Sequence, residues 1–375
     1  MKIGIVCPYN MFRGGGVQEC VIALQAGLEK RGHTAKIITP QPRASSEQHE
    51  NPHIIFIGGA TDIKSPFHTT AQISAAPNNE TIDTLLAREQ FDLLHFHEPW
   101  VPMLSRQILS RCACPVVATF HAKLPESVMS KTIERVITPY TRSILKYLDG
   151  LSAVSEAAAL YVRSLTQKPI TIIPNGIDLQ TYKLPPKKHL GKTILYIGRL
   201  EKRKGVKYLL KAFELLTPKY PDATLIIAGD GPDRAKLEDY VRDKQIPHVT
   251  FKGFVSQAEK LKLMADADLF CSPALYGESF GIVLLEAMAM GIVTVAGNNP
   301  GYASVLREHG RISLINPKEI DEFASRLELL LTDQALRQLW QSWALDYVQQ
   351  FNYEYVVKQY EDLYLQTHKH ATTQV

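Results

Sequence analysis

Short runs of β-branched and other apolar residues alternate with longer helical patterns along the whole chain. Strand, helix and strand in alternation predict a parallel sheet that helices cover on both faces. The expected helices include Val17–Arg31, Val128–Leu148 and Phe280–Met290. The expected strands are Ile3–Cys7, Lys36–Thr39, Ile54–Ile57, Asp92–His97, Pro115–Phe120, Leu151–Val154, Ile170–Ile173, Thr193–Ile197, Ala223–Ala228, His248–Phe251, Leu269–Cys271 and Val293–Ala296.

The alternation is interrupted once, at Pro174–Lys192, where Asn175-Gly176 and Pro185-Pro186 indicate a turn and a solvated linker. A chain of 375 residues is also too long for a single core. We therefore expect an α/β protein with two Rossmann-like, doubly wound parallel-sheet domains, residues 1–170 and 171–352. A last helical stretch, Tyr353–Gln366, follows the second domain.

Composition narrows the class of protein. A net charge of +4 gives no reason to expect a nucleic-acid partner. Five cysteines include only a C-x-C pair, Cys112 and Cys114, so we expect free thiols and no zinc quartet. Met1–Cys7 lacks the charged region and cleavage site of a signal peptide, and no apolar run approaches the roughly 18 residues of a membrane span. These features favour a cytoplasmic protein.

Three glycines, Gly14–Gly16, follow the first strand and open a helix. Glycine lets backbone N–H groups approach an anion, and the helix N-terminus adds partial positive charge. A tight turn without a ligand is the simpler alternative. A dinucleotide site is disfavoured because the spacing is not G-x-G-x-x-G and Thr39-Pro40-Gln41 supplies no acid for a ribose.

The segment Gly198–Gly205 follows the first strand of the second half and carries four cations. At the carboxyl end of a parallel strand, Arg199 and Lys204 would suit a diphosphate. We expect Lys202 and Arg203 to belong to a solvated face.

Two glutamates accompany a further helix start. Glu278 lies in the turn Tyr276–Gly281, and Glu286 lies two helical turns into an apolar helix. Their axial separation of roughly 12 Å is too large for the carboxylate pair of a retaining glycosidase. A buried Glu286 needs partners, for which ribose hydroxyls would serve, whereas amides around Ser279–Gly281 would seat a phosphate. Favourable charge at the helix start and a salt bridge are the structural alternatives.

Histidines end two expected strands. His121 directly follows Pro115–Phe120, a position that favours function over a structural role. His95 and His97 share one face of Asp92–His97, but no further ligand cluster is visible, so a metal is disfavoured. Asp266-Ala267-Asp268 precedes a strand and does not argue for a metal either.

Taken in order, these segments resemble the family 4 glycosyltransferases, which are retaining enzymes of the GT-B fold, and within that family the bacterial phosphatidylinositol α-mannosyltransferases. No single motif is specific, but the ordered set spans most of the chain. The motifs are G-G-V-Q at Gly15–Gln18, H-E-P at His97–Pro99, T-F-H at Thr119–His121, S-E at Ser155-Glu156, P-N-G-I-D at Pro174–Asp178, G-R-L-x-x-x-K-G at Gly198–Gly205, G-D-G at Gly229–Gly231 and E-x7-E from Glu278 to Glu286.

The resemblance implies roles for particular residues. Gly16 would contact the donor diphosphate, Glu278 the transferred sugar and Glu286 the ribose. The catalytic residues would be His121, beside the reacting carbon, with Arg199, Lys204 and Glu278. The full donor site would comprise Gly15, Gly16, Arg199, Lys204, Phe254, Val255, Lys260, Glu278, Ser279, Phe280, Gly281, Ile282 and Glu286. The acceptor side would comprise Tyr9, Gln18 and Lys123.

The resemblance also implies two domains facing each other across a cleft, with segment 353–375 packed back on the first domain. The reaction would move a hexose, mannose from GDP-mannose being favoured, to a lipid or polar acceptor such as phosphatidylinositol. It would need no cofactor and no metal. The alternatives are a UDP-sugar donor with a soluble sugar or sugar-phosphate acceptor, and a relative that binds nucleotide sugar without turnover.

Two segments bear on the acceptor. Asn78–Gln90 carries three acids against one arginine, and Gly59–Lys64 departs from the inositol-lipid enzymes in composition. A basic stripe of Lys131, Arg135, Arg142 and Lys146 would suit anionic lipid at the inner face of the cell membrane, or form the solvated face of a helix kinked at Pro139.

Overall fold

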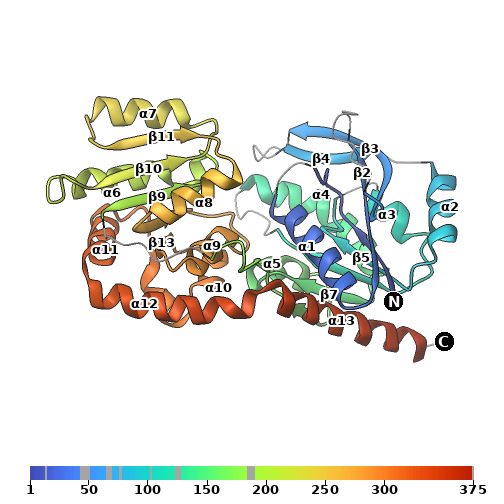
Figure 1. Cartoon of the computed structure of the whole chain (residues 1–375). Coiled ribbons are helices and arrows are strands. Elements are labelled where there is room, and N and C mark those ends of the chain that lie inside the picture. The colour runs from blue at the N-terminus through green and yellow to red at the C-terminus, as the bar shows by residue number, and fades with distance from the viewer. Residues whose placement is uncertain are drawn as a thin grey trace. The chain divides into compact units, whose positions relative to one another are not determined.

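The computed structural model describes residues 1–12, 15–42, 51–64, 70–75, 78–101, 104–122, 128–183 and 191–373 (Figure 1). The chain divides into two compact units. Unit 1 comprises Met1–Gly176 with Tyr353–Val375, and unit 2 comprises Ile177–Asn352. The sequence predicted a boundary between residues 170 and 171, but the division falls after Gly176. The reason is that Ile170–Ile172 form a strand, β8, that pairs with the sheet of unit 1.

The described part of unit 1 contains an eight-stranded sheet in the order β4-β3-β2-β1-β5-β6-β7-β8. All neighbouring pairs are parallel except β3 and β4. The antiparallel pair of β3 and β4 lies at the edge of this otherwise parallel sheet. The strands are β1 Lys2–Val6, β2 Thr34–Gln41, β3 Ile54–Lys64, β4 Thr70–Ala75, β5 Leu93–His97, β6 Val116–Phe120, β7 Gly150–Ala153 and β8 Ile170–Ile172.

The helices of unit 1 include the C-terminal helix of the chain. They are α1 Gly16–Lys30, α2 Asn79–Glu89, α3 Leu104–Leu109, α4 Val128–Leu145, α5 Glu156–Arg163 and α13 Tyr353–Thr373. Helix α13 packs against α1 and the sheet, and its Val357, Tyr360 and Tyr364 share one buried cluster with Ile3 and Ile5 of β1 (Figure 1). Burying these large apolar side chains contributes roughly 1.5–3 kcal/mol each, which fixes α13 to this unit.

The described part of unit 2 contains a parallel six-stranded sheet in the order β11-β10-β9-β12-β13-β14. Its strands are β9 Thr193–Ile197, β10 Thr224–Ala228, β11 Val249–Gly253, β12 Leu269–Ser272, β13 Val293–Gly297 and β14 Leu314–Ile315. Its helices are α6 Val206–Leu216, α7 Arg234–Asp243, α8 Gln257–Asp266, α9 Ile282–Ala289, α10 Pro300–Val305, α11 Ile320–Thr332 and α12 Gln334–Tyr347, with 3-10 turns at Lys202–Lys204, Glu308–Ser313 and Val348–Phe351.

Each sheet has one point at which the strand order reverses. In unit 1 the chain order runs outward on both sides from β1 and β5, and in unit 2 from β9 and β12. Ligands of open parallel sheets bind beyond the carboxyl ends of the strands at such a point. The topology therefore directs attention to the loops that follow β1, β5, β9 and β12.

Within the described residues, no helix has both the length and the apolar content required to cross a bilayer.

Candidate active site

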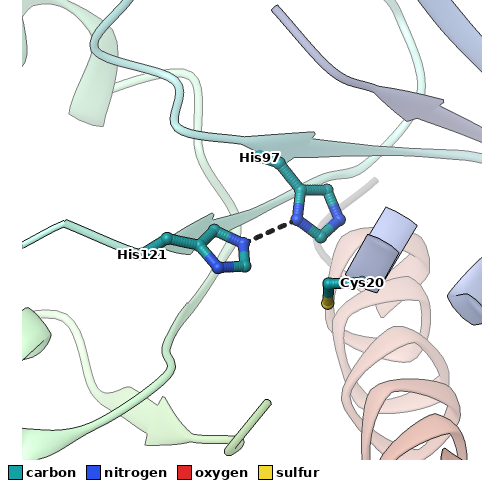
Figure 2. A group of neighbouring side chains, drawn as sticks. All are labelled: Cys20, His97 and His121. Carbon is teal, nitrogen blue, oxygen red and sulfur yellow. Dashed lines mark hydrogen bonds between the residues drawn. The ribbon is translucent and has the colours of Figure 1, made fainter. Parts of the chain in front are cut away.

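The carboxyl end of the unit 1 sheet holds a group of buried histidines. His95 and His97 lie on β5, and His121 directly follows the adjacent strand β6. Nδ1 of His97 lies 2.8 Å from Nε2 of His121, and the two rings stack with centroids 5.0 Å apart (Figure 2). The structure thus brings together the imidazoles that the sequence placed only at neighbouring strand ends.

Burial keeps these imidazoles neutral. It lowers the pKa of His121 to about 4, although a hydrogen bond with Asn175 offsets part of the effect. It lowers the pKa of His95 to about 3 and that of His97 well below its usual range. Near pH 7 His121 is therefore uncharged. One of its ring nitrogens carries a proton and can donate a hydrogen bond, the other can accept one, and the tautomer decides which is which.

His95 links this group to the C-terminal helix. Its Nδ1 lies 2.7 Å from the Tyr364 hydroxyl of α13, and its Nε2 lies 2.7 Å from Thr119 Oγ1 on β6. The His95 ring also packs on His97, with centroids 4.3 Å apart. A fully satisfied buried imidazole of this kind is a positioning element, and it supports the face on which His97 and His121 lie.

Glu98 follows β5, and its carboxylate holds the backbone of His121. Its Oε1 accepts a 2.5 Å hydrogen bond from the His121 N–H, and Glu98 itself has a left-handed backbone with φ of 51°. Burial raises the pKa of this carboxyl to about 8, although donors at His121, Ala122 and Trp100 lower it. An uncommon backbone conformation held by hydrogen bonds is typical of a functional loop.

The remaining predicted residues of unit 1 lie around the loop after β1. Gly15 caps α1 in an extended conformation, and Gly16 begins the helix. Gln18, in the first turn, donates a weak 3.4 Å hydrogen bond to the Asn10 carbonyl, and Tyr9 is half-buried before it. Lys123 lies outside the described residues.

The carboxyl end of the unit 2 sheet holds a cluster of cations and carboxylates. Oε1 of Glu278 accepts from Lys204 Nζ at 2.8 Å and from Arg203 Nη1 at 2.7 Å. Glu201 is buried between Arg199 and Arg203, at 2.9 and 3.0 Å. Arg203 is thus partly buried in the cluster, so the expectation of a solvated face was wrong for it, whereas Lys202 is exposed.

Glycines bring the loops after β9 and β12 into contact. Gly205 has a φ of 72°, and a Cβ there would collide with the carbonyl oxygen of Pro273. The Leu275 N–H donates to the Arg203 carbonyl across the same contact at 2.8 Å. Only a residue without a side chain permits this approach, which places Lys204 beside Glu278.

Glu286 is 5% exposed, on α9, as the apolar helix pattern predicted. Its Oε1 accepts from the Tyr182 hydroxyl at 2.7 Å and from Lys260 Nζ at 2.6 Å. Lys260, expected near the base, is therefore tied to the carboxylate expected to bind the ribose. Helix α9 begins at Ile282 after a left-handed Gly281, two residues later than the sequence predicted.

The other predicted donor residues differ in exposure. Ser279 is half-buried and Phe280 is buried before α9. Phe254, 87% exposed, and Val255 follow β11, which lies two strands from β9. Asp268 accepts from the backbone N–H groups of Gly191 and Thr193 at 3.1 and 2.9 Å, which gives it a structural role.

Sequence reasoning missed several members of both groups. Cys20 was treated only as a free thiol, although it lies beside His97 and His121. Asn175 was noted only as part of the P-N-G-I-D motif and was given no role. Glu201 and Tyr182 carry no local signal of function, because their roles depend on partners far along the chain.

Comparison with known protein families gives a match for each half of the chain. Residues 14–181 match the family described as Glycosyltransferase Family 4, and residues 183–344 match the one described as Glycosyl transferases group 1. Phosphatidyl-myo-inositol mannosyltransferase of Mycolicibacterium smegmatis is 32% identical over 97% of this chain and 93% of its own. The enzyme of that name from Propionibacterium freudenreichii is 30% identical over 82% and 80%.

Solved structures show the same fold. Sucrose-phosphate synthase from Thermosynechococcus elongatus superposes with a TM-score of 0.76 at 20% identity, covering 97% of this chain and 98% of its own. HepE of Anabaena, in complex with UDP and glucose, gives 0.75 at 20% identity, covering 96% and 98%. Two α/β units and these neighbours show a GT-B fold. The chain belongs to glycosyltransferase family 4.

Proposed function

We propose that the protein is a retaining hexosyltransferase that moves mannose from GDP-mannose to a lipid acceptor, phosphatidylinositol being favoured. The observation that supports it most directly is the identity of 30–32% with phosphatidyl-myo-inositol mannosyltransferases. The cluster of Arg199, Lys204 and Glu278 at the end of the unit 2 sheet adds a site suited to a nucleoside diphosphate sugar.

In this proposal the donor binds to unit 2. Arg199 and Lys204 bind the diphosphate, together with the amides that precede α9. Glu278 binds hydroxyls of the sugar and Glu286 those of the ribose. The backbone at Phe254 and Val255 contacts the base.

The acceptor hydroxyl attacks the anomeric carbon from the face that the diphosphate leaves. A carbon–oxygen bond to the acceptor forms as the bond to the diphosphate breaks, and the acceptor proton passes to the departing phosphate oxygen. The configuration is then retained without a covalent intermediate. Cations and the helix dipole stabilise the leaving group, so the transfer needs no metal. The resemblance assigns His121 to the reacting carbon and Tyr9, Gln18 and Lys123 to the acceptor.

A polar acceptor with a UDP-sugar donor is the second candidate. It is favoured by helix α2, whose Glu80 and Asp83 are exposed where a basic surface would suit an anionic bilayer. On α4, Arg135 and Arg142 are exposed, which suits lipid contact and ordinary solvation equally. We propose a cytoplasmic protein that contacts the inner face of the cell membrane through α4.

The first experiment is a thermal-shift screen against GDP-mannose, UDP-glucose, UDP-N-acetylglucosamine and NAD. The best binder is then incubated in EDTA with vesicles containing phosphatidylinositol or with soluble sugar phosphates. We expect a shift with GDP-mannose and transfer to the vesicles, with the anomer followed by NMR. A shift with a UDP-sugar would favour the second candidate. Binding without transfer to either acceptor would indicate a non-catalytic relative.

A further inference from the structure

Three side chains in unit 1 form a buried cluster of nitrogen and sulfur ligands. Cys20 from α1, His97 from the end of β5 and His121 after β6 each offer one ligand atom, and these atoms lie within 4.8 Å of one another (Figure 2). Cys20 is 2% exposed, His97 is fully buried and His121 is 8% exposed. Three elements distant in sequence thus converge on one small space, and His121 borders solvent.

One nitrogen of this cluster lacks a partner. No donor or acceptor among the described residues reaches Nε2 of His97, whereas its Nδ1 shares a hydrogen bond with His121. A buried N–H without a partner is costly, so the proton belongs on Nδ1 and Nε2 keeps a lone pair. No hydrogen bond to Cys20 Sγ occurs within the described part of the chain either. The lone pair on His97 Nε2 and the thiol of Cys20 are therefore both available to bind a metal ion.

We propose that Cys20, His97 and His121 bind one borderline-soft divalent ion, Zn²⁺, at the carboxyl end of the unit 1 sheet. Thiolate and imidazole are ligands that zinc prefers, whereas Mg²⁺ and Ca²⁺ prefer oxygen. Three protein ligands leave the fourth tetrahedral position to water, as in zinc sites that are open to solvent.

The distances fit with small movements. Around a tetrahedral zinc ion two imidazole nitrogens lie about 3.3 Å apart, and a thiolate lies about 3.6 Å from each. With His97 binding through Nε2, the two imidazole nitrogens start no more than 4.8 Å apart and close by about 1.5 Å at most, as the ion replaces the hydrogen bond between Nδ1 of His97 and His121. The thiol closes by about 1.2 Å at most. Rotamer adjustments supply shifts of this size.

Charge and protons balance in a simple way. Cys20 loses its thiol proton to solvent, the two imidazoles bind as neutral ligands, and the site gains a single positive charge. Bound zinc occupies the lone pair of His121. Zinc therefore inhibits sugar transfer, a consequence that rests on the proposed function, whereas the binding itself does not.

The test uses the full-length, reduced and metal-free protein, titrated with Co²⁺ in place of zinc. A thiolate bound to tetrahedral Co²⁺ gives a sulfur-to-metal charge-transfer band in the near ultraviolet. We expect the band to saturate at about one Co²⁺ per chain and to disappear on addition of Zn²⁺. Absence of the band, or its persistence when zinc is added, overturns the proposal.

Cysteine substitutions show which thiolate gives rise to the charge-transfer band. Cys20→Ala and Cys20→Ser remove it while far-UV circular dichroism stays unchanged, and the serine variant preserves side-chain size if alanine disturbs folding. The double variant Cys112→Ala/Cys114→Ala is the matched control, because it removes the half-buried C-x-C pair and leaves the cluster intact. A band retained without Cys20, or lost in the control, contradicts the assignment.

Activity provides an independent readout. Micromolar Zn²⁺ lowers the transfer rate of the wild type roughly tenfold or more, EDTA restores it, and Cys20→Ser is markedly less sensitive. If Co²⁺ binds as described but zinc leaves transfer unchanged, the site stands and the role given to His121 in the reaction is wrong. If neither donor nor acceptor reacts at all, the proposed function fails and the optical test still decides the metal site.

Discussion

Nζ of Lys204 lies 2.8 Å from Oε1 of Glu278, and this ion pair, like that of Arg203 with Glu278, joins the loop after β9 to the loop after β12. Both side chains are largely buried, at 18% and 14% exposure. The pair places a cation and a carboxylate at the point where the strand order of unit 2 reverses. A nucleoside diphosphate sugar would contact Lys204 through its diphosphate and Glu278 through its sugar hydroxyls.

Replacing Lys204 tests the diphosphate site. We expect Lys204→Ala to lower kcat/KM for the donor by about 10²-fold, because a cation that stabilises the departing diphosphate is lost. Lys202→Ala, in the same turn but exposed, is the matched control and should change the rate less than about twofold. Initial rates at subsaturating donor measure both. Equal effects of the two substitutions would place the diphosphate elsewhere.

Glu286 should govern donor affinity. Glu286→Ala removes the carboxylate assigned to the ribose and leaves Lys260 without its partner, so the Kd for the donor rises roughly tenfold or more. Isothermal titration with GDP-mannose measures this, and thermal unfolding separates it from loss of fold. Glu259→Gln, on the exposed side of α8, serves as the control. An unchanged Kd would remove Glu286 from the donor site.

His121 should affect turnover and not donor binding. His121→Ala is expected to reduce kcat by about 10²-fold or more while the donor Kd stays within a factor of about two. His53→Ala replaces a half-exposed histidine of the same unit, outside the group of buried histidines, and should leave both parameters unchanged. Transfer at the wild-type rate by the His121 variant would contradict the role assigned here.

We expect Glu89 to make the free energy of unfolding depend on pH in the acid range. Burial by itself raises the pKa of this carboxyl, but hydrogen bonds from Lys36, Lys2 and Arg88 outweigh it and lower the pKa to about 2. Because the folded-state pKa lies below the unfolded value, the stabilisation is present above about pH 4.5 and is lost as the pH falls towards 2.

The measurement is urea unfolding of wild type and Glu89→Gln between pH 3 and pH 7. The variant should lose about 2–3 kcal/mol at pH 7 and show a flatter dependence below pH 4.5. Glu80→Gln, exposed at the start of the same helix, should change stability by less than about 0.5 kcal/mol. A parallel pH dependence in wild type and Glu89→Gln would show that Glu89 does not carry the effect.

The local pattern determined the class of fold and the positions of most of its strands, though not all of their ends. Periodicity of two or 3.6 residues is a property of neighbouring residues, so β9 was predicted as it occurs and α1 to within one residue. The antiparallel β4 and the two-residue β14 were missed because strands so short or so polar carry too weak a pattern. Glu278 and His121 were singled out because they lie in loops that follow strands, and Glu286 because it is a carboxylate on an otherwise apolar helix. Their roles in the reaction remain predictions.

Tertiary structure decided which of these residues meet. Whether Arg203 is solvated or buried depends on Glu201 and on a loop some 75 residues away, which no local pattern encodes. The same holds for Cys20, which by sequence is an ordinary free thiol. It lies beside two histidines only because the fold brings this part of α1 close to the ends of β5 and β6. The sequence determined the elements and their chemistry, whereas packing among distant elements decided the partners, the burial and hence the protonation of each group.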